Sequence, residues 1–314
     1  MRILITGAGG FVGRHLIAAL QARGHETIAA DRHGAENVLA MDVTDALGVH
    51  GAVELARPDA VAHLAGQAFV PASFDDPVGT FAVNAFGTQH VLDAVRELEG
   101  SPRVLVVSSA DAYGPQPLAS YPLTEAVAPR PASPYAASKV AAEAITMAYA
   151  RSYGTNAVIT RAFNHIGAGQ DERFAIAGFA GQVARAAVSG DPRVLVGNLD
   201  ARRDLLDVRD VCEAYALLLE GGGKAGEIYN IASGVAVSMK EALRRLVEIA
   251  RIPVEIREDP ARMRPSDVPL AVGDAAKLRE ATGWEPRIPL IASLRDVYTA
   301  AFTAARSAGD TAAP

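Results

Sequence analysis

The sequence predicts a doubly wound α/β fold, in which parallel strands alternate with helices. Short apolar runs rich in β-branched residues recur along the chain, and Ala-, Leu-, Glu- and Arg-rich stretches of helical length separate them. Near-continuous apolarity is typical of strands buried on both faces of a sheet, and the alternation with helices indicates parallel βαβ units. The expected strands are residues 3–5, 27–30, 60–64, 104–107, 157–160 and 228–231.

Helices are expected between these runs, and the last third of the chain has a different character. The predicted helices are 13–23, 77–99 and 134–153, the last with Pro134 at a position typical of a first helical turn. Segments 165–203 and 233–300 are richer in Arg and Pro, with a short strand at 254–257 and a helix at 240–250. A smaller α/β domain is therefore expected beside the main sheet. The predicted division is 1–164 and 204–232 for the main domain, 165–203 and 233–306 for the smaller one, and 307–314 for a tail.

Length and composition fit this fold and exclude several classes of protein. At ~150 residues per domain, 314 residues allow about two domains. Hydrophobic residues make up 50% and charged residues 21%, which excludes a disordered chain. The formal net charge of −6, without a basic run, argues against a nucleic acid polymer or an anionic membrane as partner.

Cysteine and histidine usage argues against disulfide and metal chemistry. Cys212 is the single cysteine, so no intrachain disulfide is possible, and its apolar surroundings predict a buried structural thiol. No set of His, Asp and Glu has the spacing of metal ligands, so no metal is expected. The sequence shows no signal-peptide pattern and no apolar segment near the ~18 residues of a membrane span. A cytoplasmic location is expected.

A glycine-rich turn follows the first predicted strand and opens a helix. Gly7, Gly10 and Gly13 form a G-x-x-G-x-x-G pattern, which alone would also suit a plain strand–turn–helix. At this first βα junction it predicts a Rossmann fold, because glycines let backbone N–H groups approach a pyrophosphate at the positive end of a helix. His63 is expected to fill space near the cofactor. The remaining residues expected at the dinucleotide are Phe11, Val12, Leu64, Ala65 and Gly66.

Acidic residues near the second predicted strand bear on the choice of cofactor. Asp31 ends that strand, where a carboxylate accepts hydrogen bonds from the adenosine ribose and repels a 2′-phosphate. NAD(H) is therefore favoured. Arg32 could accommodate the 2′-phosphate, so NADP(H) stays open. Asp42 and Val43 either cover the adenine edge or belong to an ordinary loop.

The pattern Tyr135-x-x-x-Lys139 supplies a candidate acid/base. Residues four apart share one face of a helix, so the ammonium of Lys139 can lie beside the phenol. We expect its charge, together with a nearby nicotinamide, to lower the pKa of Tyr135. Ser109 follows the fourth run, 104–107, at the edge where doubly wound sheets bind ligands. It can donate a hydrogen bond to a carbonyl oxygen while Tyr135 transfers a proton.

Together these motifs resemble the extended short-chain dehydrogenases/reductases that act on nucleotide sugars. The glycine pattern, Ser-Ser-x-x-x-Tyr-Gly at 108–114 and Tyr135-x-x-x-Lys139 carry the likeness, which covers about residues 2–300. Within that family the chain is most similar to the branch that acts on GDP-mannose derivatives, and there to the reductases of GDP-4-keto-6-deoxy-D-mannose. The segments that carry this finer similarity are 161–170, 197–204, 262–269 and 283–286.

The resemblance implies a reaction and a set of substrate-binding residues. The reaction would be reduction of the C4 keto group of a GDP-4-keto-6-deoxyhexose by NAD(P)H, giving GDP-D-rhamnose, in a homodimer formed by helices 77–99 and 134–153. Asn164 would contact the sugar and pyrophosphate, Arg203 and Arg264 the diphosphate, and Asp267 the nucleotide ribose. Ser73 either faces the sugar or caps a helix.

Other activities stay open at this point. A GDP-mannose 4,6-dehydratase would need a further acid/base, and Asp111 stands where dehydratases of this branch carry a glutamate. An NDP-sugar 4-epimerase uses the same Ser109, Tyr135 and Lys139. A non-catalytic dinucleotide sensor is a fourth hypothesis, since fold alone does not fix function. The sequence departs from the branch at Ala168, where a proline is expected, and at Asp31, which is unusual for an NADPH-linked reductase.

Overall fold

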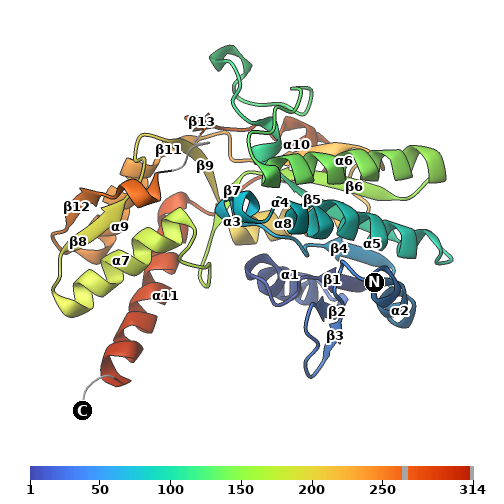
Figure 1. Ribbon diagram of the computed structural model, residues 1–314, viewed down its shortest axis with the longest axis horizontal. Coiled ribbons are helices and arrows are strands. Elements are labelled where there is room, and N and C mark those ends of the chain that lie inside the picture. Colours follow the sequence, from blue (N-terminus) through green and yellow to red (C-terminus); the bar gives the residue numbers. More distant parts are fainter. Residues whose placement is uncertain (264–267, 312–314) are drawn as a thin grey trace.

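The computed structural model describes residues 1–263 and 268–311. Its largest element is a seven-stranded, wholly parallel sheet of order β10-β6-β5-β4-β1-β2-β3, which confirms the doubly wound fold (Figure 1). All six predicted runs are strands of this sheet. The strands are β1 (Arg2–Thr6), β2 (Glu26–Asp31), β3 (Val38–Ala40), β4 (Ala60–His63), β5 (Arg103–Ser109), β6 (Ala157–Ala162) and β10 (Ile228–Ile231).

Each face of the sheet is covered by helices, because successive strand residues point to opposite sides. In β1, Ile3 and Ile5 join one apolar core, and Leu4 between them joins the other. The first core includes α1 (Phe11–Ala22) and α8 (Val208–Leu219), and holds the buried Cys212 as expected. The second includes α2 (Ala46–Ala56), α5 (Gly87–Arg96) and α6 (Pro134–Tyr153).

Helix α6 has the limits predicted for it, and its end signals explain why. The Ser133 side chain accepts a hydrogen bond from the backbone N–H of Ala136, Pro134 opens the first turn, and Gly154 ends the helix at a φ of +69°. The predicted helix 77–99 is instead divided. Its parts are α4 (Pro77–Phe81), a π-helical turn η1 (Ala82–Phe86) and α5, preceded by the short α3 (Val70–Asp75).

Two elements of the main sheet region escape the sequence patterns. Strand β3 has three residues, too short a run to show a period, and pairs with β2 at the edge of the sheet. Helix α2 contains Gly48 and Gly51, which lower helix propensity. It forms because the Asp45 side chain caps its first turn and because its apolar face packs into the second core.

The remaining elements build a smaller part around a third apolar core. It holds a four-stranded sheet, a two-stranded parallel sheet and three long helices. The predicted helix 240–250 and strand 254–257 both belong to it. Its elements are β7 (Asn164–Ile166), β9 (Arg202–Asp207), β11 (Ala236–Ser238), β13 (Leu270–Ala271), β8 (Arg193–Val196), β12 (Glu255–Glu258), α7 (Ala175–Ser189), α9 (Met239–Ala250) and α11 (Leu290–Thr311).

Two details differ from the expected division of the chain. Strand β9, whose residues 204–207 we placed with the main domain, pairs with β7, β11 and β13 in the smaller sheet. Helix α11 continues to Thr311 through part of the expected tail. The remaining short helices are η2 (Ala110–Tyr113), η3 (Leu118–Ser120), η4 (Pro260–Arg262) and α10 (Ala276–Thr282).

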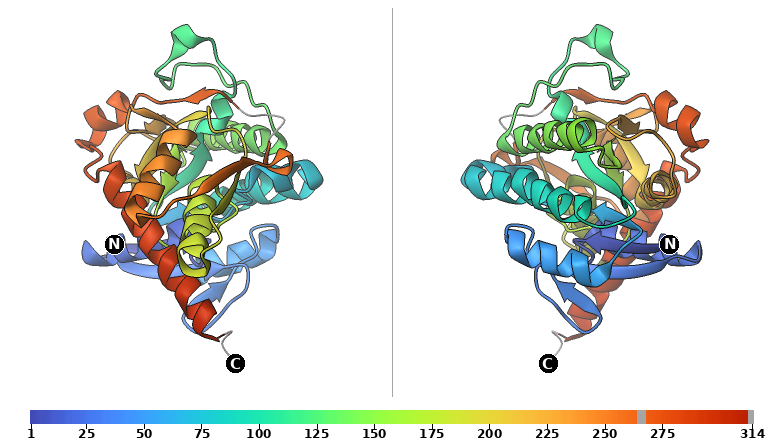
Figure 2. Two further views of the ribbon diagram at one scale, coloured as in Figure 1. Left: turned by 90° about the vertical axis from the view of Figure 1, so that its left-hand side faces the viewer. Right: turned by 90° about the vertical axis from the view of Figure 1, so that its right-hand side faces the viewer.

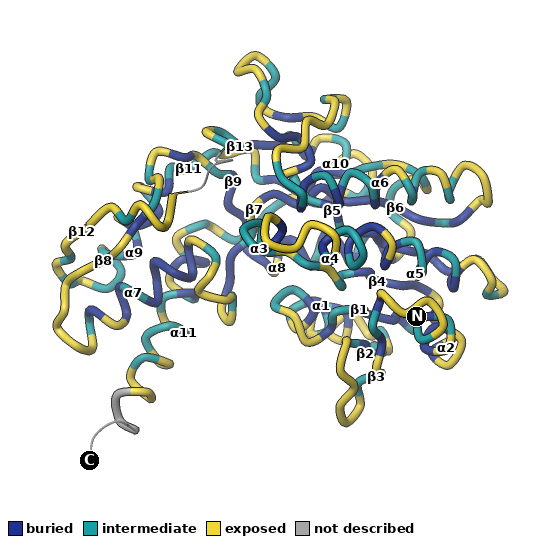
Figure 3. The backbone as a smooth tube through the Cα atoms, in the orientation of Figure 1, coloured by how far each residue is buried: buried dark blue, intermediate teal, exposed yellow. Residues whose placement is uncertain are grey.

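The outer surface is uneven. The segment 115–131 stands out from the body, and its tip is exposed (Figures 2 and 3). The central strands β1, β4, β5 and β6, by contrast, are almost wholly buried (Figure 3). Of the helices in the described chain, none combines the length and apolarity needed to cross a bilayer.

Candidate active site

The glycine-rich turn forms a cradle between β1 and α1. Gly7 has a φ of +68°, and a Cβ there would lie 2.9 Å from the backbone of Ala65. A Cβ on Gly13 would lie 2.5 Å from the carbonyl oxygen of Ala8, so α1 packs directly on the turn. Gly10 caps α1 without a side chain, which leaves the first-turn N–H groups without a side-chain acceptor. This geometry fits the pyrophosphate of a dinucleotide.

A cavity of about 690 Å³ opens beside the cradle. Gly66 forms part of its wall, and a Cβ there would lie 3.4 Å from Nζ of Lys139. The cavity brings together residues predicted for the cofactor, the reaction and the substrate. Those that line it are Gly7, Gly10, Phe11, Val12, Gly13, Leu64, Gly66, Ser109, Asp111, Tyr135, Asn164 and Arg203.

The acidic residues near β2 are held by local hydrogen bonds. Asp31 accepts from the backbone N–H of Gly9 at 2.8 Å, which places its carboxylate beside the glycine turn. Arg32 donates through Nε to Asp42 at 3.0 Å. Hydrogen bonds from Thr44, and then the charge of Arg32, lower the pKa of Asp42 to about 2. Val43 is buried in the second core, where a Cβ on Gly87 would lie 2.8 Å from it.

Ser109 and Tyr135 meet where β5 ends against α6. The Ser109 hydroxyl lies near enough to the Tyr135 hydroxyl to influence the pKa of that phenol, and it accepts from the backbone N–H of Asp111 at 3.1 Å. One turn along α6, Lys139 donates from Nζ to the carbonyl oxygen of Val107 at 2.8 Å. The three side chains predicted for catalysis therefore come from one strand end and one helix face.

Burial sets the protonation states of Tyr135 and Lys139. It raises the pKa of Tyr135 above the usual value for a phenol; the charge of Asp111 raises it further, and the hydrogen bond with Ser109 lowers it. The lowering expected from Lys139 together with a bound nicotinamide stays a prediction, because burial dominates among the protein's own groups that act on Tyr135. Burial also lowers the pKa of Lys139 to about 8, against the opposing charge of Glu143. Tyr135 thus keeps its proton, as a proton donor must.

Behind these residues lies a buried ion pair that sequence reasoning missed. Glu143 and Arg161 are bonded at 2.6 Å and 2.8 Å, and their side chains are only 2% and 3% exposed. Ser108 donates to the same carboxylate at 2.6 Å. The guanidinium lies 4.5 Å from the centre of the Tyr113 ring. The pair ties α6 to β5 and β6 next to Ser109 and Lys139.

Asn84 is a second support missed by the sequence. Its Oδ1 accepts from the backbone N–H of Gln67 at 2.8 Å, and its Nδ2 donates to Ser138 Oγ at 2.9 Å. Ser138 stands between Tyr135 and Lys139 on α6. Asn84 lies on the π-helical turn η1, which the sequence pattern of a continuous helix over 77–99 did not predict.

His63 acts as a structural residue. Its ring nitrogens lie 2.9 Å from Thr6 Oγ1 and 3.2 Å from Thr88 Oγ1. Burial, followed by the charge of Lys139, lowers the pKa of His63 to about 3, so the ring is neutral. This agrees with the expectation that it fills space and is not a base.

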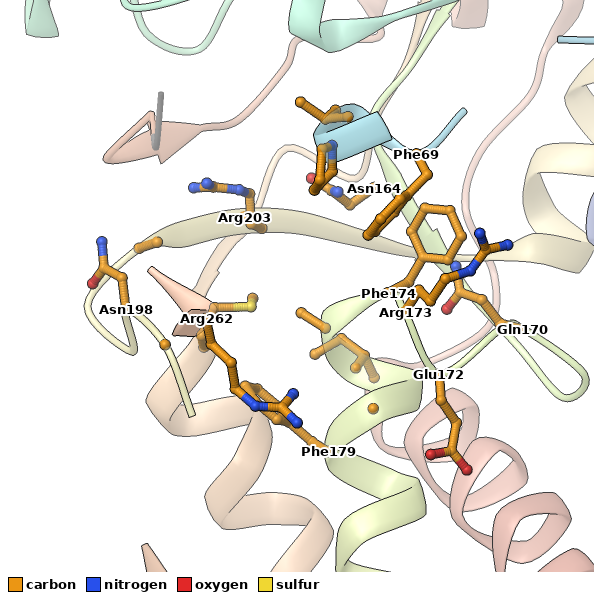
Figure 4. A pocket seen from close by; sticks show the side chains of 18 of the residues that line it. Phe69, Asn164, Gln170, Glu172, Arg173, Phe174, Phe179, Asn198, Arg203 and Arg262 are labelled. Atoms are coloured by element: carbon orange, nitrogen blue, oxygen red, sulfur yellow. The ribbon is translucent and has the colours of Figure 1, made fainter. Parts of the chain in front are cut away.

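A second cavity of about 670 Å³ adjoins the first, between α3, α7 and β9 (Figure 4). Asn164 and Arg203 line both cavities, as a substrate role for them requires. Ser73 Oγ instead donates to the carbonyl oxygen of Val70 inside α3, whose N-cap residue is Phe69. Arg264 and Asp267 lie outside the described residues.

Other side chains complete this second cavity. Phe69, Arg173 and Phe174 form its edge toward the first cavity, and Asn198 and Arg262 lie toward the far end (Figure 4). Arg262 opens the segment 262–269, which carries part of the family resemblance, but the resemblance gave the diphosphate role in that segment to Arg264. Nothing in the local pattern distinguished Arg173 from a surface arginine.

The first turns of α1 are joined to the loop after β7. Arg14 donates to the carbonyl oxygen of Gly9 at 2.7 Å and to that of Gly169 at 3.3 Å. His15 Nε2 lies 3.1 Å from the carbonyl oxygen of Ala168. The Phe11 ring stacks on His165, with 6.3 Å between ring centres. These contacts hold the start of α1, on the first cavity, against the loop that follows β7.

Comparison with known proteins agrees with this geometry. A model of the family described as GDP-mannose 4,6 dehydratase matches residues 4–297. The chain is 39% identical, over 95% of its length and 96% of the relative's, to GDP-6-deoxy-D-mannose reductase of Pseudomonas aeruginosa. The structure of RMD from Pseudomonas aeruginosa complexed with NADPH superposes with a TM-score of 0.88 at 36% identity, covering 97% of this chain and 100% of that one. The structure of UDP-glucose 4-epimerase of Thermus thermophilus complexed with NAD superposes with a TM-score of 0.86 at 34% identity. The match covers 96% of this chain and 99% of that one.

Proposed function

The chain belongs to the GDP-mannose 4,6-dehydratase family, and from this premise we propose that it reduces the C4 keto group of GDP-4-keto-6-deoxymannose to give GDP-D-rhamnose. It is an oxidoreductase that uses a nicotinamide dinucleotide. The observation that carries the proposal is the meeting of Ser109 and Tyr135 in a cavity that runs from the glycine cradle to Asn164 and Arg203.

The chain's own groups divide the work of such a reduction. The glycine turn holds the pyrophosphate, Asp31 the adenosine ribose, and Lys139 the nicotinamide ribose. When bound, the nicotinamide supplies the hydride for C4. Tyr135, kept protonated by burial, donates its proton to the C4 oxygen. Ser109 donates a hydrogen bond to that oxygen and stabilises the negative charge that develops on it.

The finer choice of cofactor follows from the charges near β2. We propose a preference for NAD(H), because Asp31 stands beside Gly9 and would repel a 2′-phosphate. Arg32, the cation that could accept the phosphate, is already paired with Asp42. The proposal therefore differs from the NADPH bound to the Pseudomonas aeruginosa structure.

The activity is tested with freshly prepared GDP-4-keto-6-deoxymannose and either NADH or NADPH. We expect stoichiometric loss of absorbance from the reduced cofactor and a product with the chromatographic and NMR properties of GDP-D-rhamnose. Conversion of GDP-mannose to a 4-keto sugar without net cofactor use would instead identify a dehydratase. That outcome would direct attention to Asp111, which lines the cavity near Tyr135.

We also propose a cytoplasmic location, because the buried and free Cys212 fits a reducing compartment. We propose further that two copies of the chain pair through α5 and α6. Apolar side chains remain exposed on the adjoining elements, with Val78 79% and Phe86 53% exposed. Burial against a second copy would remove them from water. Light scattering should give a dimer for the wild type and a monomer for Phe86→Glu.

A further inference from the structure

We propose that Arg173 is a second guanidinium for the diphosphate of the substrate, beside Arg203. The inference rests on the proposed function, in which the hexose lies at Tyr135 in the first cavity. The nucleoside then occupies the second cavity, which Tyr135 does not line. The diphosphate joins these two parts, so it must cross the boundary between the cavities.

The boundary is defined by the residues that line both cavities. Among those of the described chain, Arg173 and Arg203 are the two guanidinium groups. His165 also lies there, but burial lowers its pKa, so it is a neutral group. A diphosphate carries more than one negative charge, and a forked guanidinium is well suited to phosphate oxygens.

The local contacts of Arg173 set its side chain at this crossing. Its guanidinium lies 5.2 Å from the centre of the Phe69 ring, which stands at the start of α3. Phe69 in turn meets Phe174 edge to face at 6.0 Å. The three side chains form a bridge from the main sheet region to the loop before α7 (Figure 4).

The present partner of Arg173 is one that a substrate can replace. Asp171 accepts from Nε of Arg173 at 3.0 Å, two residues away on the same loop. The Arg173 side chain is 63% exposed, and exposed ion pairs contribute little because water screens them. The guanidinium can therefore turn from Asp171 to the diphosphate at small cost while its ring contact keeps it near the crossing.

A neighbouring pair provides a matched control. Arg185 donates to Glu172 at 2.9 Å, and both side chains are 53% exposed. Arg185 lines neither cavity. It thus has the same chemistry, a similar exposure and a place on the same part of the chain, without access to the crossing.

The test is calorimetric titration of the protein, saturated with NADH, with GDP and with guanosine. Arg173→Gln should weaken GDP binding by about tenfold, the effect of losing one charge-assisted contact, and leave guanosine and NADH binding unchanged. Arg173→Lys should fall between, since it keeps the charge and loses the fork. Arg185→Gln should bind all three ligands as the wild type does.

Unchanged GDP binding by Arg173→Gln would overturn the inference, as would an equal loss for GDP and guanosine. The wild type is also titrated with UDP, to separate this inference from the proposed function. A preference for UDP would contradict the proposed substrate, and the Arg173 variants would then be compared with UDP and uridine, because the inference concerns the diphosphate and not the base. Failure of the wild type to bind either diphosphate would overturn both.

Discussion

The two cavities hold their charges in opposite ways. Around the first, Glu143 and Arg161 are almost wholly buried and bonded to each other, to Ser108 and to the Tyr113 ring. Along the second, Arg262 and Arg173, which also reaches the first cavity, are exposed and paired with acids near them in the sequence. The reacting end of the site is therefore a fixed framework, whereas the charged side chains of the substrate end can change partners.

The sharpest way to break the fixed framework is to remove its proton donor. Tyr135→Phe should lower kcat by about 10²- to 10⁴-fold, the contribution of a positioned acid. The dissociation constant for NADH, measured by fluorescence, should stay near that of the wild type. A variant that turned over normally would show that Tyr135 is not the acid.

Removing one member of the buried pair should cost stability. Glu143→Gln leaves the Arg161 charge buried without its counter-charge, and we expect a loss of about 3 kcal/mol in the free energy of unfolding. The exposed counterpart, Glu172→Gln, should change the same quantity by less than ~1 kcal/mol. Urea denaturation measures the free energy of unfolding of both variants. Equal losses would contradict the proposed difference between the buried and the exposed ion pair.

The cofactor preference tests the charge at the edge of the first cavity. Asp31→Asn keeps an acceptor for the N–H of Gly9 and removes the negative charge. We expect the ratio of NADPH to NADH affinity to rise by about tenfold, the scale of one screened charge contact. A ratio that does not move would place the 2′-hydroxyl away from Asp31.

The smallest effect expected is a dependence on pH. The pKa of Lys139 is lowered from 10.5 to about 8, so its ammonium is present below that pH and is lost as the pH rises through it. Tyr135 stays protonated over the same range because its pKa is raised. The rate of reduction should therefore decline above about pH 8. A level profile across the alkaline range would contradict this assignment.

The sequence predicted the framework better than the chemistry inside it. Strand runs and the limits of α6 depend on local signals, and both were predicted correctly. The side chains of Ser133 and Pro134 and the backbone of Gly154 act only on the adjacent turns. The raised pKa of Tyr135 among the protein's own groups was not predicted, because it depends on how deeply the folded protein buries the phenol. The π-helical turn that carries Asn84 escaped for a similar reason, since it depends on contacts with Gln67 and Ser138 far along the chain.

The substrate end was predicted by family likeness and not by local rules. Asn164 and Arg203 do line both cavities. Ser73, by contrast, donates its hydroxyl proton within its own helix. Arg173 could not be found in advance because its importance lies in a place, the crossing of two cavities, that exists only once loops distant in sequence have come together.

The contact between α1 and the loop after β7 limits how this chain can be re-engineered. Arg14 reaches from the glycine turn to Gly169, and His15 reaches to Ala168. A hybrid enzyme that takes its cofactor half from one parent and its sugar half from another would pair Arg14 and His15 with a loop from a different protein. A hybrid that exchanges residues 165–169 together with Arg14 and His15 should keep these hydrogen bonds. The segment to exchange therefore includes residues from both halves of the enzyme.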